Sequence, residues 1–263
     1  MEVLYVIPAW LVALMLLLLV AAAVESGYRL GRRTSRAMSG QSSGVFSTLM
    51  GAVLGLLGLL LAFSFAMAAA RYDLRKAIVL REANAIGTTY LRASFLEEPA
   101  RVQIQELLRT YVDARLQYDD ANSGQTQVER ATTKTERLQR ELWALVSTEA
   151  RRDLHATHVL WLAQSLNDVI DLSSEQVSAR DNHVPETVLW MLLVAAVLTG
   201  FLGGYACGAT AQRHVLVTSV FAVLVTLVIY AILDLDRPRR GLIRVNQQAM
   251  SSLRESLQRD ISQ

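Results

Sequence analysis

The polar residues whose spacing could support metal chemistry are few. His155 and His158 lie three residues apart, with Glu149 and Asp153 nearby. A zinc site needs three or four ligands in tetrahedral geometry, so two histidines at this spacing are a weak signal. We therefore expect solvated histidines here and predict no metal site.

A second polar group, Asp234 and Asp236, lies at the end of the last apolar run. Calcium takes six to eight oxygen ligands, and two carboxylates supply too few. The basic residues Arg237, Arg239 and Arg240 follow directly. We expect the carboxylates to pair locally with these arginines, because charges at a membrane boundary usually pair or extend toward water.

The sequence contains no arrangement typical of catalysis. A GxSxG elbow, a phosphate-binding P-loop, an HExxH motif and a glycine fingerprint after a strand are all missing from it. The one cysteine, Cys207, lies between Ala206 and Gly208, where a thiol behaves as a small apolar group. We predict that the protein is not an enzyme and uses no cofactor.

Bulky apolar side chains in the second apolar run favour a different kind of function. Leu56, Leu60, Phe63 and Met67 recur at spacings of four, three and four residues, so they share one helix face. Such a face can narrow a pore, since apolar constrictions gate ion flow by dewetting. The stripe is also typical of ordinary helix packing and lipid contact, and this alternative stays open.

The same run carries a face of small residues, which recur three or four positions apart. The members of this face are Gly51, Gly55, Gly58, Ala62, Ala66 and Ala69. Small residues let membrane helices approach closely, because lipid gives the helices no hydrophobic reason to associate. We predict that this face packs against another helix.

Four long apolar runs position these residues. They cover residues 4–24, 45–70, 187–212 and 215–233. A helix of about 20 apolar residues crosses a bilayer and bonds all its backbone polar groups internally. The composition, 52% hydrophobic and 19% charged, also indicates a membrane part joined to a polar part. We predict an all-α, polytopic membrane protein with four transmembrane helices.

The segment between the second and third runs is polar and has helical periodicity. Apolar residues such as Ile104, Leu108 and Tyr111 recur on one face, which predicts a helical bundle outside the membrane. No glycine or proline lies between Ala70 and Gly87, so one helix should continue from the second span into this bundle. The predicted organisation is a first helix pair (1–70), a helical domain (71–186), a second helix pair (187–235) and a polar tail (236–263).

Two charge counts give opposite orientations for these spans. Arg29, Arg32, Arg33 and Arg36 place the first loop in the cytoplasm if the first helix decides the topology. The larger number of basic residues on the opposite side places the helical domain in the cytoplasm instead. We favour the cytoplasmic helical domain.

The centres of the four runs contain no ionisable residue, which favours a passive pore over a transporter. Ion-coupled transporters usually require buried ionisable groups. At the end of the second run, Arg71, Arg75 and Lys76 could gather anions at a pore mouth. Juxtamembrane basic residues more often bind lipid phosphates, so that alternative stays open.

Several motifs resemble those of a known family. The stretch from Gly58 to Ser64, followed by the segment 71–76 (RYDLRK), resembles the second helix of bestrophins. The segments 82–88 (EANAIGT) and 234–241 (DLDRPRRG) resemble signatures of the bacterial bestrophin-like family, and the layout of spans and domain matches that family. The bestrophin tryptophan-rich stretch is missing from 74–80. The polar signature positions are Glu82, Asn84, Thr88, Asp234, Asp236 and Arg237.

This resemblance implies a homopentameric chloride channel in the bacterial cytoplasmic (inner) membrane, with the second helices lining its axis. Phe63 would form the apolar neck, with Leu59 or Leu60 one turn away. The implied partners are the bilayer, further copies of the chain and a permeant anion. The net charge of +2 gives no sign of nucleic-acid binding.

Other interpretations remain beside the channel. The chain could be a non-conducting membrane scaffold or sensor whose helical domain binds a protein partner, and a transporter is a third, disfavoured interpretation. Glu82, Asn84 and Thr88 could cap a helix or bridge between subunits, or they could form a satisfied polar contact within the bundle.

Overall fold

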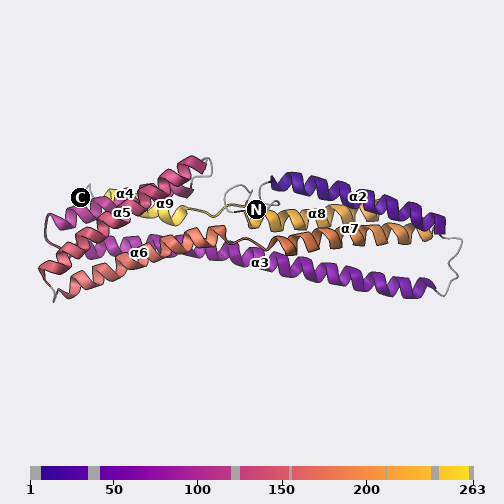
Figure 1. The fold of residues 1–263 in the computed structure, drawn as a ribbon, viewed down its shortest axis with the longest axis horizontal. Coiled ribbons are helices and arrows are strands. Elements are labelled where there is room, and N and C mark those ends of the chain that lie inside the picture. The colour runs from indigo at the N-terminus through magenta and orange to yellow at the C-terminus, as the bar shows by residue number, and fades with distance from the viewer. Residues whose placement is uncertain are drawn as a thin grey trace. The chain divides into compact units, whose positions relative to one another are not determined.

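The structure is a computed structural model that describes residues 7–34, 42–119, 125–153, 156–210, 212–237 and 243–260. All regular elements within these ranges are helices (Figure 1), which confirms the expected all-α class. In chain order they are α2 (Ala9–Thr34), α3 (Ser42–Ala93), α4 (Ala100–Asp119), α5 (Gln125–Arg152), α6 (Thr157–Asp181), α7 (Glu186–Ala209), α8 (Val215–Leu235) and α9 (Gln248–Arg259).

Four helical stretches are long and apolar enough to cross a membrane, as the sequence predicts. They are Ala9–Thr34, Ser47–Ala93, Thr157–Ala209 and Val215–Leu235. In the third stretch the apolar part is α7, which begins directly after Pro185. The start of the first predicted run, at Leu4, lies outside the described residues.

Helix α3 is continuous over 52 residues, from Ser42 to Ala93. The predicted uninterrupted helix beyond Ala70 is therefore confirmed. Its length follows from the local sequence, because no proline or glycine between Ala70 and Gly87 breaks the backbone hydrogen bonds. The bulky stripe and the polar signature of residues 82–88 consequently lie on one helix.

Contacts within the chain define two compact units. The membrane unit comprises Met1–Tyr72 and His183–Arg244, and the bundle unit comprises Asp73–Asn182 and Val245–Gln263. Helix α3 contributes its first part to the membrane unit and its second part to the bundle unit.

In the membrane unit, α2 and α7 pack at very short range through glycines. A Cβ atom on Gly204 would lie 2.0 Å from the Val24 carbonyl oxygen, and one on Gly27 would lie 2.1 Å from the Phe201 carbonyl oxygen. Gly31 and Gly208 have equally close backbone neighbours across the same contact. Only glycine allows such an approach, which is the usual role of small residues between membrane helices.

The bundle unit has its own apolar core. Ile86 of α3, Ile104 and Leu108 of α4, Leu142 of α5 and Leu162 of α6 are fully buried in it. Helix α9 adds Met250 and Leu257 to the same core, so part of the predicted polar tail packs into this unit. The sequence break expected at residues 122–124 lies outside the described residues, between the end of α4 and the start of α5.

Candidate functional site

The bulky stripe of α3 is on a face that the rest of the chain leaves open. Leu56, Leu59 and Phe63 are 57%, 52% and 64% exposed, and Met67 is also exposed. Leu60 differs, because it is half-buried and packs against the core of the membrane unit. The structure thus brings Leu56, Leu59, Phe63 and Met67 onto one open apolar face.

The small-residue face of α3 is open as well. Cβ atoms built on Gly51, Gly55 and Gly58 meet nothing within 4 Å among the described residues, and Ala62 is exposed. On this part of α3 the buried residues are Leu57, Ser64 and Ala68, which lie on a third face of the helix. The packing partner predicted for the small face is therefore not found within the described chain.

The three basic residues expected at the pore mouth have different surroundings. Arg75 is buried, and its guanidinium donates hydrogen bonds of 3.0 Å each to the carbonyl oxygens of Ala179 and Asn182 at the end of α6. Such bonds satisfy carbonyl groups that a helix end leaves unpaired. Arg71 is half-buried, whereas Lys76 is exposed. Of the three, Lys76 is the residue most available to solvent.

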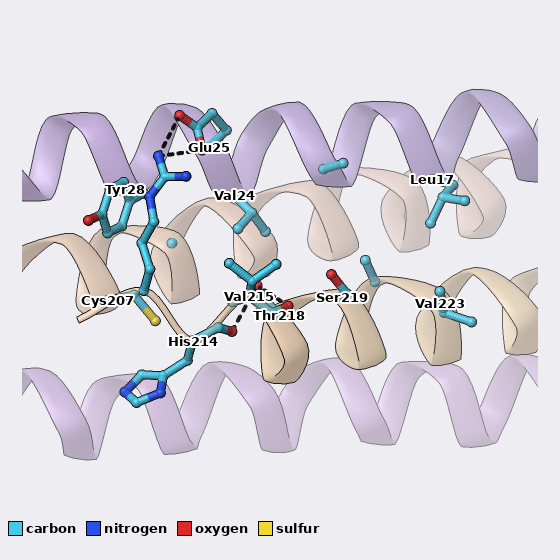
Figure 2. A pocket seen from close by; sticks show the side chains of 14 residues that line it. Leu17, Val24, Glu25, Tyr28, Cys207, His214, Val215, Thr218, Ser219 and Val223 are labelled. Carbon is cyan, nitrogen blue, oxygen red and sulfur yellow. Dashed lines mark hydrogen bonds and ion pairs between the residues drawn. The ribbon is translucent and has the colours of Figure 1, made fainter.

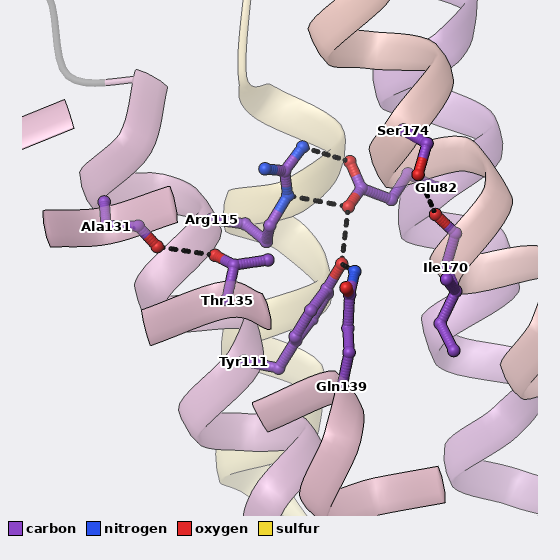
Figure 3. A network of polar contacts seen from close by, with 8 residues as sticks. All are labelled: Glu82, Tyr111, Arg115, Ala131, Thr135, Gln139, Ile170 and Ser174. Carbon is purple, nitrogen blue, oxygen red and sulfur yellow. Dashed lines mark hydrogen bonds and ion pairs between the residues drawn. The ribbon is translucent and has the colours of Figure 1, made fainter. Parts of the chain in front are cut away.

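Glu82 is the centre of a buried polar network in the bundle unit. Its carboxylate accepts hydrogen bonds from Arg115 at 2.7 and 3.0 Å and from the Tyr111 hydroxyl at 3.2 Å. Figure 3 shows these side chains converging, with the Gln139 amide donating to the Tyr111 oxygen at 3.2 Å. Glu82 thus makes the satisfied contact within the bundle that was one of its two expected roles, and both members of the ion pair are almost fully buried.

Burial, reinforced by the Glu82 carboxylate, raises the pKa of the Tyr111 hydroxyl above its ordinary value. Tyr111 therefore keeps its proton and remains a hydrogen-bond donor to Glu82 at neutral pH. The other polar positions of the same signature, Asn84 and Thr88, are exposed on α3.

Asp234 and Asp236 at the end of α8 brace backbone segments of the membrane unit. Asp236 accepts a 2.7 Å hydrogen bond from the backbone amide of Val184, and Asp234 accepts one of 2.8 Å from that of Ile243. Both aspartates and Arg237 are buried. Arg239 and Arg240, which were expected to pair with these carboxylates, lie outside the described residues.

The remaining candidates for metal binding do not gather into a site among the described residues. No group of three or more His, Cys, Asp or Glu side chains that could hold a metal ion occurs there. His158 is half-buried, Glu149 forms a 2.7 Å ion pair with Arg152, and His155 lies outside the described residues.

Two features of the structure were missed or only partly predicted. Glu82 stands out in the sequence, but its partner Arg115, which lies 33 positions away, does not. The glycine contact between α2 and α7 was also not predicted, although glycines four residues apart at Gly27 and Gly31 carry the usual signal.

Comparisons with known proteins identify a family and a shared fold. A family model described as the Bestrophin-like domain matches residues 17–250. A comparison with curated protein sequences finds no match.

Solved structures share the fold at low sequence identity. The crystal structure of a bacterial bestrophin homologue from Klebsiella pneumoniae has a TM-score of 0.70 and 14% identity, over 95% of this chain and 97% of that one. A variant of that homologue gives a TM-score of 0.69 at 16% identity, over 95% and 98% of the two chains. A crystal structure described as that of a membrane protein gives 0.66 at 15% identity, over 97% and 99%.

Proposed function

This chain belongs to the bestrophin-like family, and we propose that several copies of it assemble into a passive anion channel lined by α3. We further propose a homopentamer in the bacterial cytoplasmic membrane, with chloride as a permeant ion. The observation that carries the proposal is the open apolar face of α3 in the membrane unit.

Two neighbouring faces of α3, one with bulky and one with small side chains, are open in the described part of the chain. Leu56, Leu59, Phe63 and Met67 are open on one face, while Gly51, Gly55, Gly58 and Ala62 leave a shallow surface beside it. Assembly around an axis would use both faces: the small residues would contact the neighbouring copy, and the bulky residues would point to the axis. In this arrangement the bulky stripe lines the pore and the small-residue face joins neighbouring copies.

The proposed neck is a ring of Phe63 side chains, with Leu59 one turn away. Apolar rings of this kind control ion flow by excluding water when they are narrow. The sequence from Val45 to Ala70 contains no charged residue, so the pathway has no site for coupling ion movement to proton transfer. Passive conduction is the function that fits these side chains.

Basic residues at the end of the apolar part of α3 support anion selectivity. Lys76 is exposed and Arg71 half-buried, and both positive charges would attract anions to the mouth. Arg75 has a different proposed role, since its hydrogen bonds to Ala179 and Asn182 hold the end of α6.

The test is ion flux from liposomes that contain the purified protein, with the oligomer's mass measured on the same sample. We expect chloride flux, and a higher flux for Phe63→Ala because the variant widens the neck. Phe65→Ala is the matched control: Phe65 is an exposed phenylalanine two positions along α3 and off the bulky stripe.

Other outcomes would contradict parts of the proposal. Cation flux would retain the pore and overturn its selectivity. A defined oligomer that conducts neither as wild type nor as Phe63→Ala would favour the alternative of a scaffold or sensor. Equal effects of Phe63→Ala and Phe65→Ala would remove the specific role of the stripe.

A further inference from the structure

A pocket of about 320 Å³ lies within the membrane unit, between α2, α7 and α8. Figure 2 shows it near the turn that joins α7 to α8, with side chains of all three helices around it. Leu17 and Val223 line one end, which is apolar, and Glu25 and Tyr28 line the other, which is polar. The α3 face proposed above for conduction does not contribute to it.

The pocket forms because α7 packs against the backbone of α2, whereas α8 leaves a groove beside α2. Gly204 lets α7 touch the α2 backbone at Val24, whereas α8 faces α2 with the small side chains of Thr218, Ser219 and Ala222. These small residues leave a groove between α2 and α8. Val223 is 51% exposed at its edge, so the groove opens onto the apolar surface of the unit.

Charged groups of α2 and of the segment just before α8 meet at the polar end. The Arg213 guanidinium lies 3.1 and 3.3 Å from the two Glu25 carboxylate oxygens and stacks over the Tyr28 ring at 4.4 Å. Arg29 also donates to Glu25, at 2.8 Å. Two guanidinium groups therefore share one carboxylate, and one positive charge remains in excess. Arg32 and Arg33 in the last turn of α2 add to the positive charge at this end.

These features match an amphiphile with an anionic head. The polar end lies near the end of α7 and the start of α8, and the ends of membrane helices are where they meet the lipid headgroups. Arginine binds phosphate oxygens through its fork of N–H donors, and an acyl chain fits an apolar groove that opens to lipid. A soluble anion would leave the apolar part of the pocket without a contact.

We propose that this pocket binds an anionic phospholipid, with its phosphate at Arg213 and an acyl chain in the groove between α2 and α8. The site holds a structural or regulatory lipid. It depends on the membrane location of the chain but not on whether the chain conducts ions.

Cys207 provides a direct probe, because it lines the pocket and is the single cysteine of the chain. The rate at which a maleimide modifies Cys207 is measured in a non-ionic detergent with added phosphatidylglycerol, phosphatidylcholine or glycerol phosphate. At a lipid concentration about ten times its Kd, the unoccupied fraction and hence the rate should fall about tenfold. We expect this protection from phosphatidylglycerol, and little from the other two.

Two matched pairs of variants locate the protection. Arg213→Gln should weaken phosphatidylglycerol binding about tenfold, whereas Arg81→Gln removes an exposed arginine that does not line the pocket and should leave binding nearly unchanged. Val223→Trp should fill the apolar end of the groove and weaken the protection of Cys207 by phosphatidylglycerol. Val220→Trp is its control, since Val220 is exposed on α8 but does not line the pocket.

Each outcome that would contradict the lipid site can be told apart from the others. Equal protection by phosphatidylcholine would overturn anionic recognition, and protection by glycerol phosphate alone would indicate a site for a soluble phosphate. Protection that grows with protein concentration in the absence of lipid would show that a second copy covers the pocket. Unchanged modification with every lipid would refute the site, even if the protein conducts chloride.

Discussion

Glycines line two surfaces of the membrane unit, and these surfaces have opposite surroundings. Between α2 and α7, Cβ atoms on Gly27 and Gly204 would lie 2.1 and 2.0 Å from carbonyl oxygens. On α3, Gly51, Gly55 and Gly58 meet nothing within 4 Å in the described part of the chain. The residue type and the spacing are alike in both places. A small-residue face therefore predicts close packing without saying whether the partner is in the same chain.

The largest expected effect comes from a substitution in the glycine contact between α2 and α7. Gly204→Leu places a side chain where the Val24 carbonyl stands, so α2 and α7 must separate along their whole contact. We expect a loss of more than about 5 kcal/mol in the free energy of unfolding, and little folded protein in detergent. The measurement is size-exclusion chromatography followed by thermal unfolding.

The adjacent glycine is the control for this variant. A Cβ atom on Gly203 would meet only the flexible end of Met50, at 3.4 Å, so Gly203→Leu should fold. Similar losses in both variants would show that backbone contact is not the reason for glycine at position 204.

The second expected effect concerns the part of α3 in the bundle unit, where other helices of the same chain bury Glu82. Arg115→Met leaves the buried Glu82 carboxylate without its cation and should lower the free energy of unfolding of the bundle unit by about 3–5 kcal/mol. Arg81→Met breaks an exposed ion pair with Glu175 and should cost less than about 1 kcal/mol. Denaturant titration in micelles compares the two variants.

A double variant sharpens this comparison. Replacing both partners, as in Glu82→Leu with Arg115→Met, removes the unpaired charge and should recover much of the loss. If the double variant were no more stable than Arg115→Met, the cost would come from lost packing and not from a stranded charge.

A smaller effect is expected at Tyr111. Tyr111→Phe removes the hydrogen bond to Glu82 and should cost about 1 kcal/mol at neutral pH. Because the folded-state pKa of Tyr111 is raised, the unfolded chain loses this proton first, and the associated stability is complete below about pH 10 and declines as the pH rises beyond it. Unfolding measured between pH 8 and 11 should show a shallower decline for Tyr111→Phe; an identical decline would contradict the assignment.

The smallest effect on folding is expected on the open surface. Gly55→Leu meets no neighbour in the chain and replaces glycine inside a helix, so the fold should change by less than about 1 kcal/mol. Assembly should suffer instead, which mass photometry would detect as a shift toward smaller species. Gly203→Leu is again the control, and an intact oligomer in Gly55→Leu would argue against self-association through this face.

Several structural features could be predicted because they depend on local sequence. The apolar runs determine the four spans, and the absence of proline and glycine after Ala70 determines the continuous α3. The bulky stripe was predicted by helical spacing, but the inward turn of Leu60 was not, since it depends on the position of the neighbouring helices. The partner of Glu82 could not be identified either, because an ion pair across 33 positions leaves no periodic signal.

The sequence by itself therefore determined the helices, their lengths and which of them are apolar enough for a membrane. These properties follow from hydrophobicity and backbone propensity, which are read over a few turns of chain. Only the tertiary structure decided which glycine face is filled, that Arg75 holds the end of α6, and that Glu25, Tyr28 and Arg213 meet at one pocket. Such contacts join residues far apart in sequence, so their distances are fixed by how the helices pack and not by any local pattern.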